Sequence, residues 1–244
     1  MHADHVAGLP GVLFMVAHAG RTEPLDIYGP VGTAYVVEGL RRIADVMPFP
    51  VRIHEIRGGD TFTLPGNLHA SCTNAAHGIP CLAYRAQLAR RPEFQVEKAK
   101  ALGLPVQMWS RLQHGETLEY NGQVYTSEQV LGNPRRGISF AYITDTRPIP
   151  ALSAFAHDVD LLICESMYDD PDDIPLAREH KHMYVGESAA IAKEARAHSL
   201  LLTHFSPKII DTSRAEQVAR RVFPNAKAGR DGMVVTLAFH DVVA

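Results

Sequence analysis

The sequence begins MHADHVAGLPG (residues 1–11), and this stretch places two histidines and an aspartate within four positions. His2, Asp4 and His5 would put several metal-ligand atoms on one short loop that a Gly/Pro turn closes. One loop cannot complete a coordination sphere, so we expect further ligands downstream, as isolated His or Asp residues at strand ends. Three residues meet that description: His77, Asp145 and His204. The pattern therefore indicates a hydrolytic metal site.

Length, composition and charge limit the number of domains and the kinds of partner that the chain can have. A chain of 244 residues with 46% hydrophobic residues can bury a sizeable core, and we expect a single domain over residues 1–244. The formal net charge of −3 argues mildly against a dedicated nucleic-acid-binding module, so such binding would need a local patch or metal ions that meet phosphate. The three cysteines have no CxxC spacing, which favours reduced thiols in a cytosolic protein. No apolar run reaches membrane-spanning length, and we expect no membrane partner.

Strands and helices alternate along the chain, a pattern typical of an α/β layered domain. The apolar runs and turn residues predict strands at 25–28, 51–57, 68–76, 81–88, 138–144, 160–164, 199–203 and 233–239. Helices are predicted at 8–20, 95–102, 187–197 and 212–222, and one more follows the turn GPVGT (residues 29–33). That turn is either structural or a phosphate cradle without the spacing of a P-loop.

Two of these helices carry specific expectations for their buried faces. In the helix at 8–20, Leu13, Phe14 and either Val16 or Ala17 are expected to face inward. In the helix after GPVGT, the apolar stripe is expected to consist of Val36, Leu40, Ile43 and Met47.

Residues 90–136 are more polar and read as an excursion from the core, with a hairpin around Asn121-Gly122. Trp109, Arg135 and Arg136 make this excursion the best candidate for a surface that contacts the substrate. The alternative is a solvated hairpin with no role in binding.

Two candidate ligands also have ordinary structural interpretations. Asp145 follows an apolar strand and precedes Pro148, where α/β sheets place functional groups, yet an aspartate there is also a common helix N-cap. His77 sits in a turn between two strands, where a lone histidine is more often capped or exposed.

Six segments of the sequence, taken in their order along the chain, together resemble a known family. The segments are His2-Ala-Asp4-His5, Gly29-Pro-Val-Gly-Thr33, His77 before Gly-Ile-Pro, Thr144-Asp-Thr-Arg-Pro148, His182 before an AAxIAKEA-like helix, and Leu202-Thr-His-Phe-Ser-Pro207. The chain resembles ribonuclease Z of the metallo-β-lactamase superfamily over essentially its whole length. The resemblance implies a four-layer αβ/βα sandwich, two zinc ions, a homodimer in the cytoplasm, and cleavage of precursor tRNA at its 3′ trailer.

The resemblance also implies a role for each matching residue. His2 and His77 would ligate one zinc, Asp4, His5 and His204 the other, and Asp145 would bridge them, so that a hydroxide held between the ions attacks the phosphodiester. Glu165 and His182 look like an acid pair, in which the carboxylate orients an imidazole that protonates the leaving 3′ oxygen. Asp4 would also steer the attacking water.

Departures from the family pattern leave other interpretations open. The family loop is His-x-His-x-Asp-His, and its first histidine would precede Met1, so we expect an N-terminally incomplete chain that lacks the first strands of one sheet. The His2/His77 site would then bind zinc weakly, which could leave one zinc where the family has two. The segment Cys164-Glu165-Ser166-Met167 keeps only the carboxylate of the family's His-Glu-Ala-Thr. The alternatives are another phosphodiesterase or hydrolase of the same fold, and an inactive remnant that binds RNA.

Overall fold

The computed structural model describes residues 2–43 and 46–239 and divides into two compact units. The first unit contains the residues up to Gln87 together with Ser139–Thr236, and the second contains Leu88–Ile138 with the residues from Leu237. None of the helices within these described ranges is long and apolar enough to cross a membrane.

The main sheet has seven strands in the order β11-β10-β9-β8-β5-β4-β3. Their bounds are β3 Thr61–Leu64, β4 Leu68–Asn74, β5 Leu82–Arg90, β8 Arg135–Ile143, β9 Leu161–Glu165, β10 Leu200–Thr203 and β11 Ala226–Ala228. Strands β8 to β11 are parallel neighbours, whereas β3 and β4 pair antiparallel. Because β8, β9 and β10 are parallel, their carboxyl ends meet at one edge of the sheet, where open α/β sheets bind ligands.

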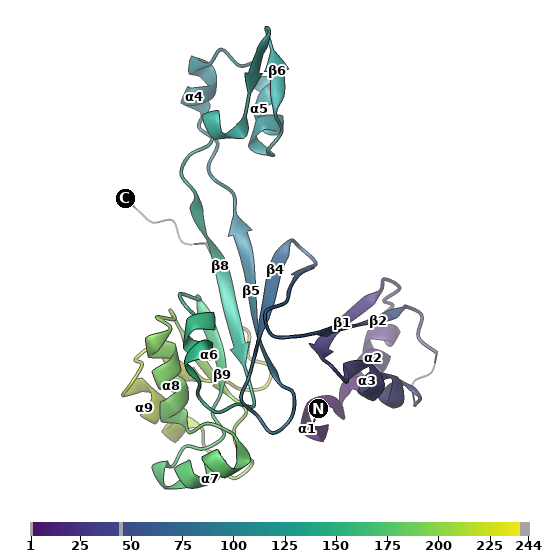
Figure 1. Cartoon of the computed structure of the whole chain (residues 1–244), viewed down its shortest axis with the longest axis vertical. Helices are drawn as coiled ribbons and strands as arrows, with labels where there is room; N and C mark the ends of the chain where they lie inside the picture. The colour runs from purple at the N-terminus through teal and green to yellow at the C-terminus, as the bar shows by residue number, and fades with distance from the viewer. Residues whose placement is uncertain (1, 44–45, 240–244) are drawn as a thin grey trace. The chain divides into compact units, whose positions relative to one another are not determined.

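Helices pack against the parallel half of this sheet (Figure 1). They are α6 (Pro150–Phe155), α7 (Ile174–His180), α8 (Val185–Glu194) and α9 (Ser213–Arg220). Helix α8 turns Ala189 and Ala192 toward the core, and neither side chain is exposed. The small side chains let α8 lie close to β9 and β10, whose Leu162 and Leu202 are fully buried. The strands predicted at 138–144, 160–164 and 199–203 and the helices predicted at 187–197 and 212–222 are confirmed to within a few residues.

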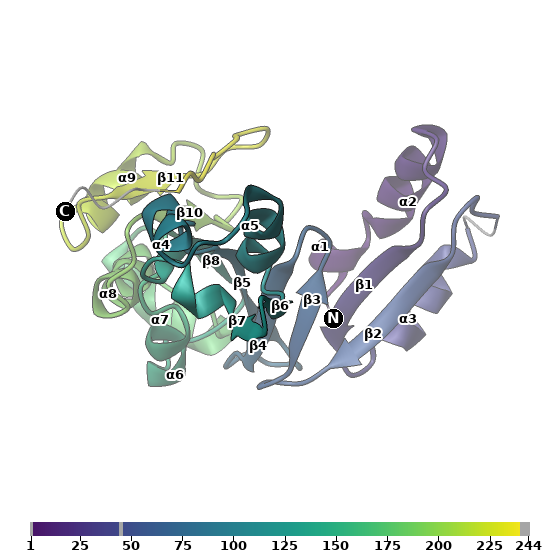
Figure 2. The ribbon, with the colours of Figure 1, turned by 90° about the horizontal axis from the view of Figure 1, so that it is seen from above.

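A two-stranded parallel sheet, β1 (Leu25–Pro30) and β2 (Val51–Ile56), forms the other layer of this unit. Helix α3 (Thr33–Arg41) runs along both strands (Figure 2), and α1 (Ala3–Val6) and α2 (Leu9–His18) precede them.

The turn GPVGT leads from β1 into α3 and is structural. Gly32 has φ +101°, a left-handed conformation that glycine adopts without strain. The Glu55 carboxylate accepts hydrogen bonds from the backbone amides of Gly32 (2.9 Å) and Ala34 (3.0 Å). These amides at the start of α3 are therefore already satisfied by an anion, which leaves them no part in a phosphate cradle.

Three expectations for buried or paired residues were wrong. Phe14 is 54% exposed, because α2 buries only Pro10 and Leu13, and Ile43 is 81% exposed, because α3 ends at Arg41 before reaching it. Residues 233–239 form no strand; instead β11 pairs with β10. The apolar run 233–239 is therefore left without a ladder partner within the described residues.

The second unit has a small core of its own. It contains α4 (Val96–Ala101), α5 (Val106–Gln113) and the hairpin of β6 (Leu118–Tyr120) and β7 (Gln123–Tyr125), packed around buried side chains that include Leu112 and Val130. The predicted hairpin is confirmed, since Asn121 (φ +50°) and Gly122 (φ +73°) both take the positive φ values that a type I′ turn requires.

Candidate metal centre

All six residues predicted as metal ligands come together in the first unit. Their donor atoms form overlapping groups in which each atom lies within 4.8 Å of the others: His2, His77 and Asp145; Asp4, His5 and His204; and Asp145, His182 and His204. Asp145 and His204 each belong to two groups, so the groups make one continuous cluster. The first two groups divide the candidate ligands as the family resemblance implied, and the third adds His182.

The N-terminal contribution comes from a short helix, where a loop was expected. His2 is extended (φ −80°, ψ 152°) and immediately precedes α1, whose first turn carries Asp4 and His5. One turn of helix suffices to place these side chains near one another. The expectation of a loop was wrong because the backbone at Asp4 and His5 is already helical.

Asp145 lies at the centre of the cluster, just beyond the end of β8. Its side chain is 5% exposed, and the carboxylate lies 2.9 Å from His5 Nε2, 3.3 Å from His204 Nε2 and 3.7 Å from His77 Nε2. Burial alone would raise the pKa of this carboxyl, but the charge of His204, a hydrogen bond from Thr144 and the charge of His5 outweigh burial and lower it. Asp145 is therefore an anion at neutral pH.

His77 is oriented by a contact on the far side of its ring. Its Nδ1 lies 3.1 Å from the Lys181 carbonyl oxygen, which can only accept, so Nδ1 carries the proton. In the neutral ring Nε2 then keeps its lone pair, and this atom is 3.4 Å from His2 Nδ1. A histidine held by a backbone carbonyl in this way is typical of metal ligands.

His204 is delivered by the turn after β10. Its φ of +57° is uncommon for a residue with a Cβ, and such strain collects at functional sites. Burial lowers the pKa of His204, against the opposing charges of Asp145 and Glu165, and a neutral imidazole is the form that ligates. Its Nδ1 is buried without a hydrogen-bond partner among the described residues.

Glu165 and His182 form a second arrangement at the same sheet edge. Glu165, the last residue of β9, is fully buried and accepts hydrogen bonds from Thr146 N (2.5 Å), Met183 N (3.0 Å) and His182 Nδ1 (3.2 Å). Burial lowers the pKa of His182, but the hydrogen bond and charge of Glu165 more than offset this, and the pKa lies above its ordinary value. A carboxylate that orients a protonatable imidazole is an arrangement suited to proton transfer.

The donor set fits a divalent metal ion. Five imidazoles, those of His2, His5, His77, His182 and His204, crowd around the Asp145 carboxylate. The carboxylates can only accept and the His77 lone pair points among these rings, so the cluster offers more acceptors than it has donors to satisfy. Nitrogen and carboxylate ligands suit zinc, and also manganese or iron, and a cation would satisfy the whole cluster.

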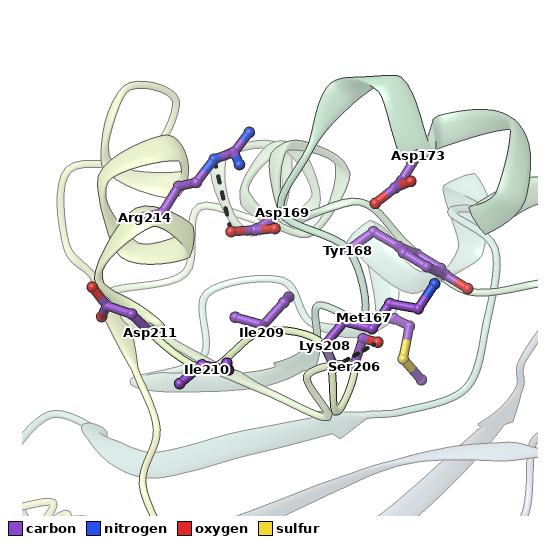
Figure 3. A pocket seen from close by; sticks show the side chains of 10 residues that line it. All are labelled: Met167, Tyr168, Asp169, Asp173, Ser206, Lys208, Ile209, Ile210, Asp211 and Arg214. Atoms are coloured by element: carbon purple, nitrogen blue, oxygen red, sulfur yellow. Dashed lines mark hydrogen bonds and ion pairs between the residues drawn. The ribbon is translucent and has the colours of Figure 1, made fainter.

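A cavity of about 360 Å³ adjoins this edge of the sheet. Figure 3 shows the side chains that line it, which include residues of the loops after β9 and β10. These two loops are joined by a backbone hydrogen bond from Ser206 N to Met167 O (3.0 Å). Both loops start from site residues, Glu165 and His204. The cavity is lined by both acidic and basic side chains, including Asp169 and Arg214, which lie 3.8 Å apart.

The expected substrate contacts, Trp109, Arg135 and Arg136, lie in the second unit. The Trp109 indole donates to the Leu104 carbonyl oxygen (2.9 Å) and packs against that unit's core, and Arg135 Nε donates to the Arg91 carbonyl oxygen (2.8 Å). The Trp109 and Arg135 side chains thus each have an internal contact, and contact of all three residues with a substrate stays a prediction.

Two residues of the site were not predicted from the sequence. Arg147 and Glu187 form a two-pronged ion pair next to His182. Arg147 stands in the quoted Thr-Asp-Thr-Arg-Pro segment, but no spacing rule connects it with Glu187, forty residues away.

Comparison with known proteins places this fold and site. A model of the beta-lactamase superfamily domain matches residues 84–205. The structure aligns with the short form of human tRNase Z with a TM-score of 0.62 at 18% identity, over 98% of this chain and 77% of that one. It aligns equally, at 0.62 and 20% identity, with the metallo-β-lactamase fold protein YhfI from Bacillus subtilis, over 96% and 73% of the two chains. The protein is thus a metal-dependent hydrolase with the metallo-β-lactamase fold, and the expected fold class is confirmed.

Closer relatives narrow the class to a family. Ribonuclease Z of Clostridium tetani is 38% identical and ribonuclease Z of Clostridium kluyveri 40% identical, in each case over 98% of this chain and 80% of the relative. The chain belongs to the ribonuclease Z family and is an endoribonuclease.

Proposed function

We propose that this protein is a zinc-dependent endonuclease that removes the 3′ trailer from precursor tRNA. The observation that carries the proposal is the convergence of six His and Asp ligands beside the Glu165–His182 pair, in a chain whose relatives are named ribonuclease Z. The family name supports an RNA substrate, and the neighbouring structure of human tRNase Z supports tRNA.

The cluster would hold up to two zinc ions, the one at His2 and His77 more weakly because that group offers fewer ligands. His2 and His77 would hold one, Asp4, His5 and His204 the other, and Asp145 would contact both. When bound, such ions activate water and stabilise negative charge on a phosphodiester. Asp4, whose side chain is 65% exposed, is the acidic ligand most accessible from solvent and would orient the attacking water.

His182 would protonate the leaving 3′ oxygen. Its Nδ1 is bound by Glu165, so the proton for the leaving group sits on Nε2 of the imidazolium. The geometry would also let His182 act as a ligand with Asp145 and His204. The contact with Glu165 favours the acid, because the carboxylate holds the charged form and raises the pKa.

The testing experiment uses the purified chain and a labelled precursor tRNA with a 3′ trailer. We expect cleavage at one position at the trailer boundary, loss of cleavage after treatment with a chelator, and recovery on adding zinc, because activation of water depends on the ions. Zinc bound per chain is measured in parallel.

Other outcomes identify the competing functions. Hydrolysis of bis(p-nitrophenyl) phosphate without cleavage of the precursor would indicate a different phosphodiesterase. RNA binding with less than one zinc per chain and no cleavage would indicate an inactive binding protein. Size measurement in solution tests the homodimer, which remains a prediction.

A further inference from the structure

We propose that Arg147 is a positioning residue for His182. The guanidinium would fix the backbone on which the imidazole is mounted, while Glu165 fixes the ring itself. The inference rests on the proposed role of His182 as the proton donor. It assigns a role in the reaction to a residue outside both the metal cluster and the acid pair.

The contacts of the Arg147 guanidinium are specific. Nη1 donates to the His182 carbonyl oxygen and to Glu187 Oε2 (3.0 Å), and Nη2 donates to Glu187 Oε1. The Arg147 and Glu187 side chains are only 19% and 22% exposed. A two-pronged arginine–carboxylate pair with limited solvent access defines direction as well as distance, which a surface ion pair does not.

Glu187 extends the restraint to the other side of His182. Its Oε2 also accepts a hydrogen bond from the backbone amide of Tyr184 (2.9 Å), at the start of α8. The ion pair therefore holds the carbonyl of residue 182 and the amide of residue 184 at once. Between them, the Met183 amide donates to Glu165, so consecutive backbone groups of this loop are held by the Arg147–Glu187 pair and by Glu165.

The backbone of Arg147 is itself anchored to the metal-ligand cluster. Its amide donates to the Ala76 carbonyl oxygen (3.0 Å), and the Ala76 amide donates to Thr146 Oγ1 (2.8 Å). His77 follows directly and contacts Lys181 O, the residue before His182. Arg147 thus joins three loops, those that carry His77, Asp145 and His182.

Loss of the guanidinium would leave the His182 carbonyl and the Glu187 carboxylate without their shared donor. The Glu165 contact remains, but one hydrogen bond to the ring permits rotation and displacement of the loop. A displacement of about 1 Å in a catalytic group can lower a rate by about 100-fold. Lysine keeps the charge but offers a single donor position, so it cannot replace the fork.

The test compares Arg147→Lys with Arg220→Lys as a matched control. Arg220 also contacts a carboxylate, Glu216 (2.8 Å), and a backbone carbonyl, that of Ala226 (2.9 Å), but lies on α9. For Arg147→Lys we expect kcat for precursor tRNA to fall about 10- to 100-fold, with KM within about twofold and the zinc content unchanged. The control keeps the parent kcat.

The ¹⁵N signals of the histidine rings supply a readout independent of activity. The His182 ring, assigned from a His182→Asn variant, should show a protonated Nδ1 bound to carboxylate in the parent chain. In Arg147→Lys we expect this signal to shift or broaden, and in Arg220→Lys to stay. Glu187→Gln should produce a smaller change of the same kind, and its combination with Arg147→Lys no more loss than Arg147→Lys alone.

An unchanged kcat together with an unchanged His182 signal in Arg147→Lys would overturn the inference. If Arg147→Lys folds poorly, Glu187→Gln takes its place in the test. A parental kcat together with an unchanged His182 ring signal in Glu187→Gln would then overturn the inference. Full activity of His182→Asn would instead refute the proposed acid. The ring signal would then still decide whether Arg147 positions His182.

Discussion

Replacing Asp145 with asparagine is expected to reduce cleavage by about 1,000-fold or more, which corresponds to about 4 kcal/mol of activation free energy. Among the residues that the structure describes, Asp145 is the one carboxylate that contacts His5, His77 and His204, so its charge serves both proposed zinc sites. Asparagine is the informative replacement, because the backbone has φ +29° at this position and asparagine tolerates positive φ better than alanine does. The zinc content per chain should fall below that of the parent.

Zinc content by mass spectrometry and single-turnover cleavage of precursor tRNA measure this effect. Glu38→Gln, which removes an exposed carboxylate on α3, controls for the loss of a negative charge and should match the parent in both. Retention of the parent zinc content and rate in Asp145→Asn would show that the cluster does not hold the catalytic metal.

Replacing His182 with asparagine is expected to lower kcat by about 100- to 10,000-fold, the usual contribution of a general acid. The direction in which kcat changes with pH follows from the pKa of His182. Burial lowers the pKa of His182, but the hydrogen bond and charge of Glu165 outweigh burial and the net pKa is raised. His182 therefore stays protonated to a higher pH than an ordinary histidine. An acid works while protonated, and kcat should therefore fall as the pH rises through this raised pKa.

Glu165→Gln separates the charge of the carboxylate from its place in the structure. Burial of His182 remains while the compensating charge is gone, so the alkaline decline of kcat should move to lower pH. Unfolding in denaturant accompanies the rate measurements, because Glu165 also accepts two backbone hydrogen bonds in the core. An alkaline decline that persists unchanged in His182→Asn would assign it to another group.

Local patterns in the sequence were sufficient for much of the fold. Apolar runs predicted the central strands, and Asn121-Gly122 predicted the hairpin, because turn chemistry and strand periodicity act over a few residues. Where packing decides, the same reasoning failed. Phe14 and Ile43 carry the right hydrophobicity for a core, but which side chains of a short amphipathic helix are buried depends on the helix ends and on the partner it meets.

The candidate ligands are likewise visible in the sequence. His and Asp residues at strand ends are chemically recognisable one by one, and parallel strands bring their carboxyl ends to one edge, so the convergence of Asp145, Glu165 and His204 follows from strand order. The sequence alone thus determined the fold class and the family, and it identified the six His and Asp side chains that the structure brings together as candidate ligands.

Only the tertiary structure decided how these side chains are held. The Arg147–Glu187 pair, the Lys181 carbonyl that selects the His77 tautomer and the Glu55 carboxylate that caps α3 all join segments distant in the chain. No local pattern encodes such contacts, because each depends on the distance and direction between loops that come together only when the sheet and its helices have packed.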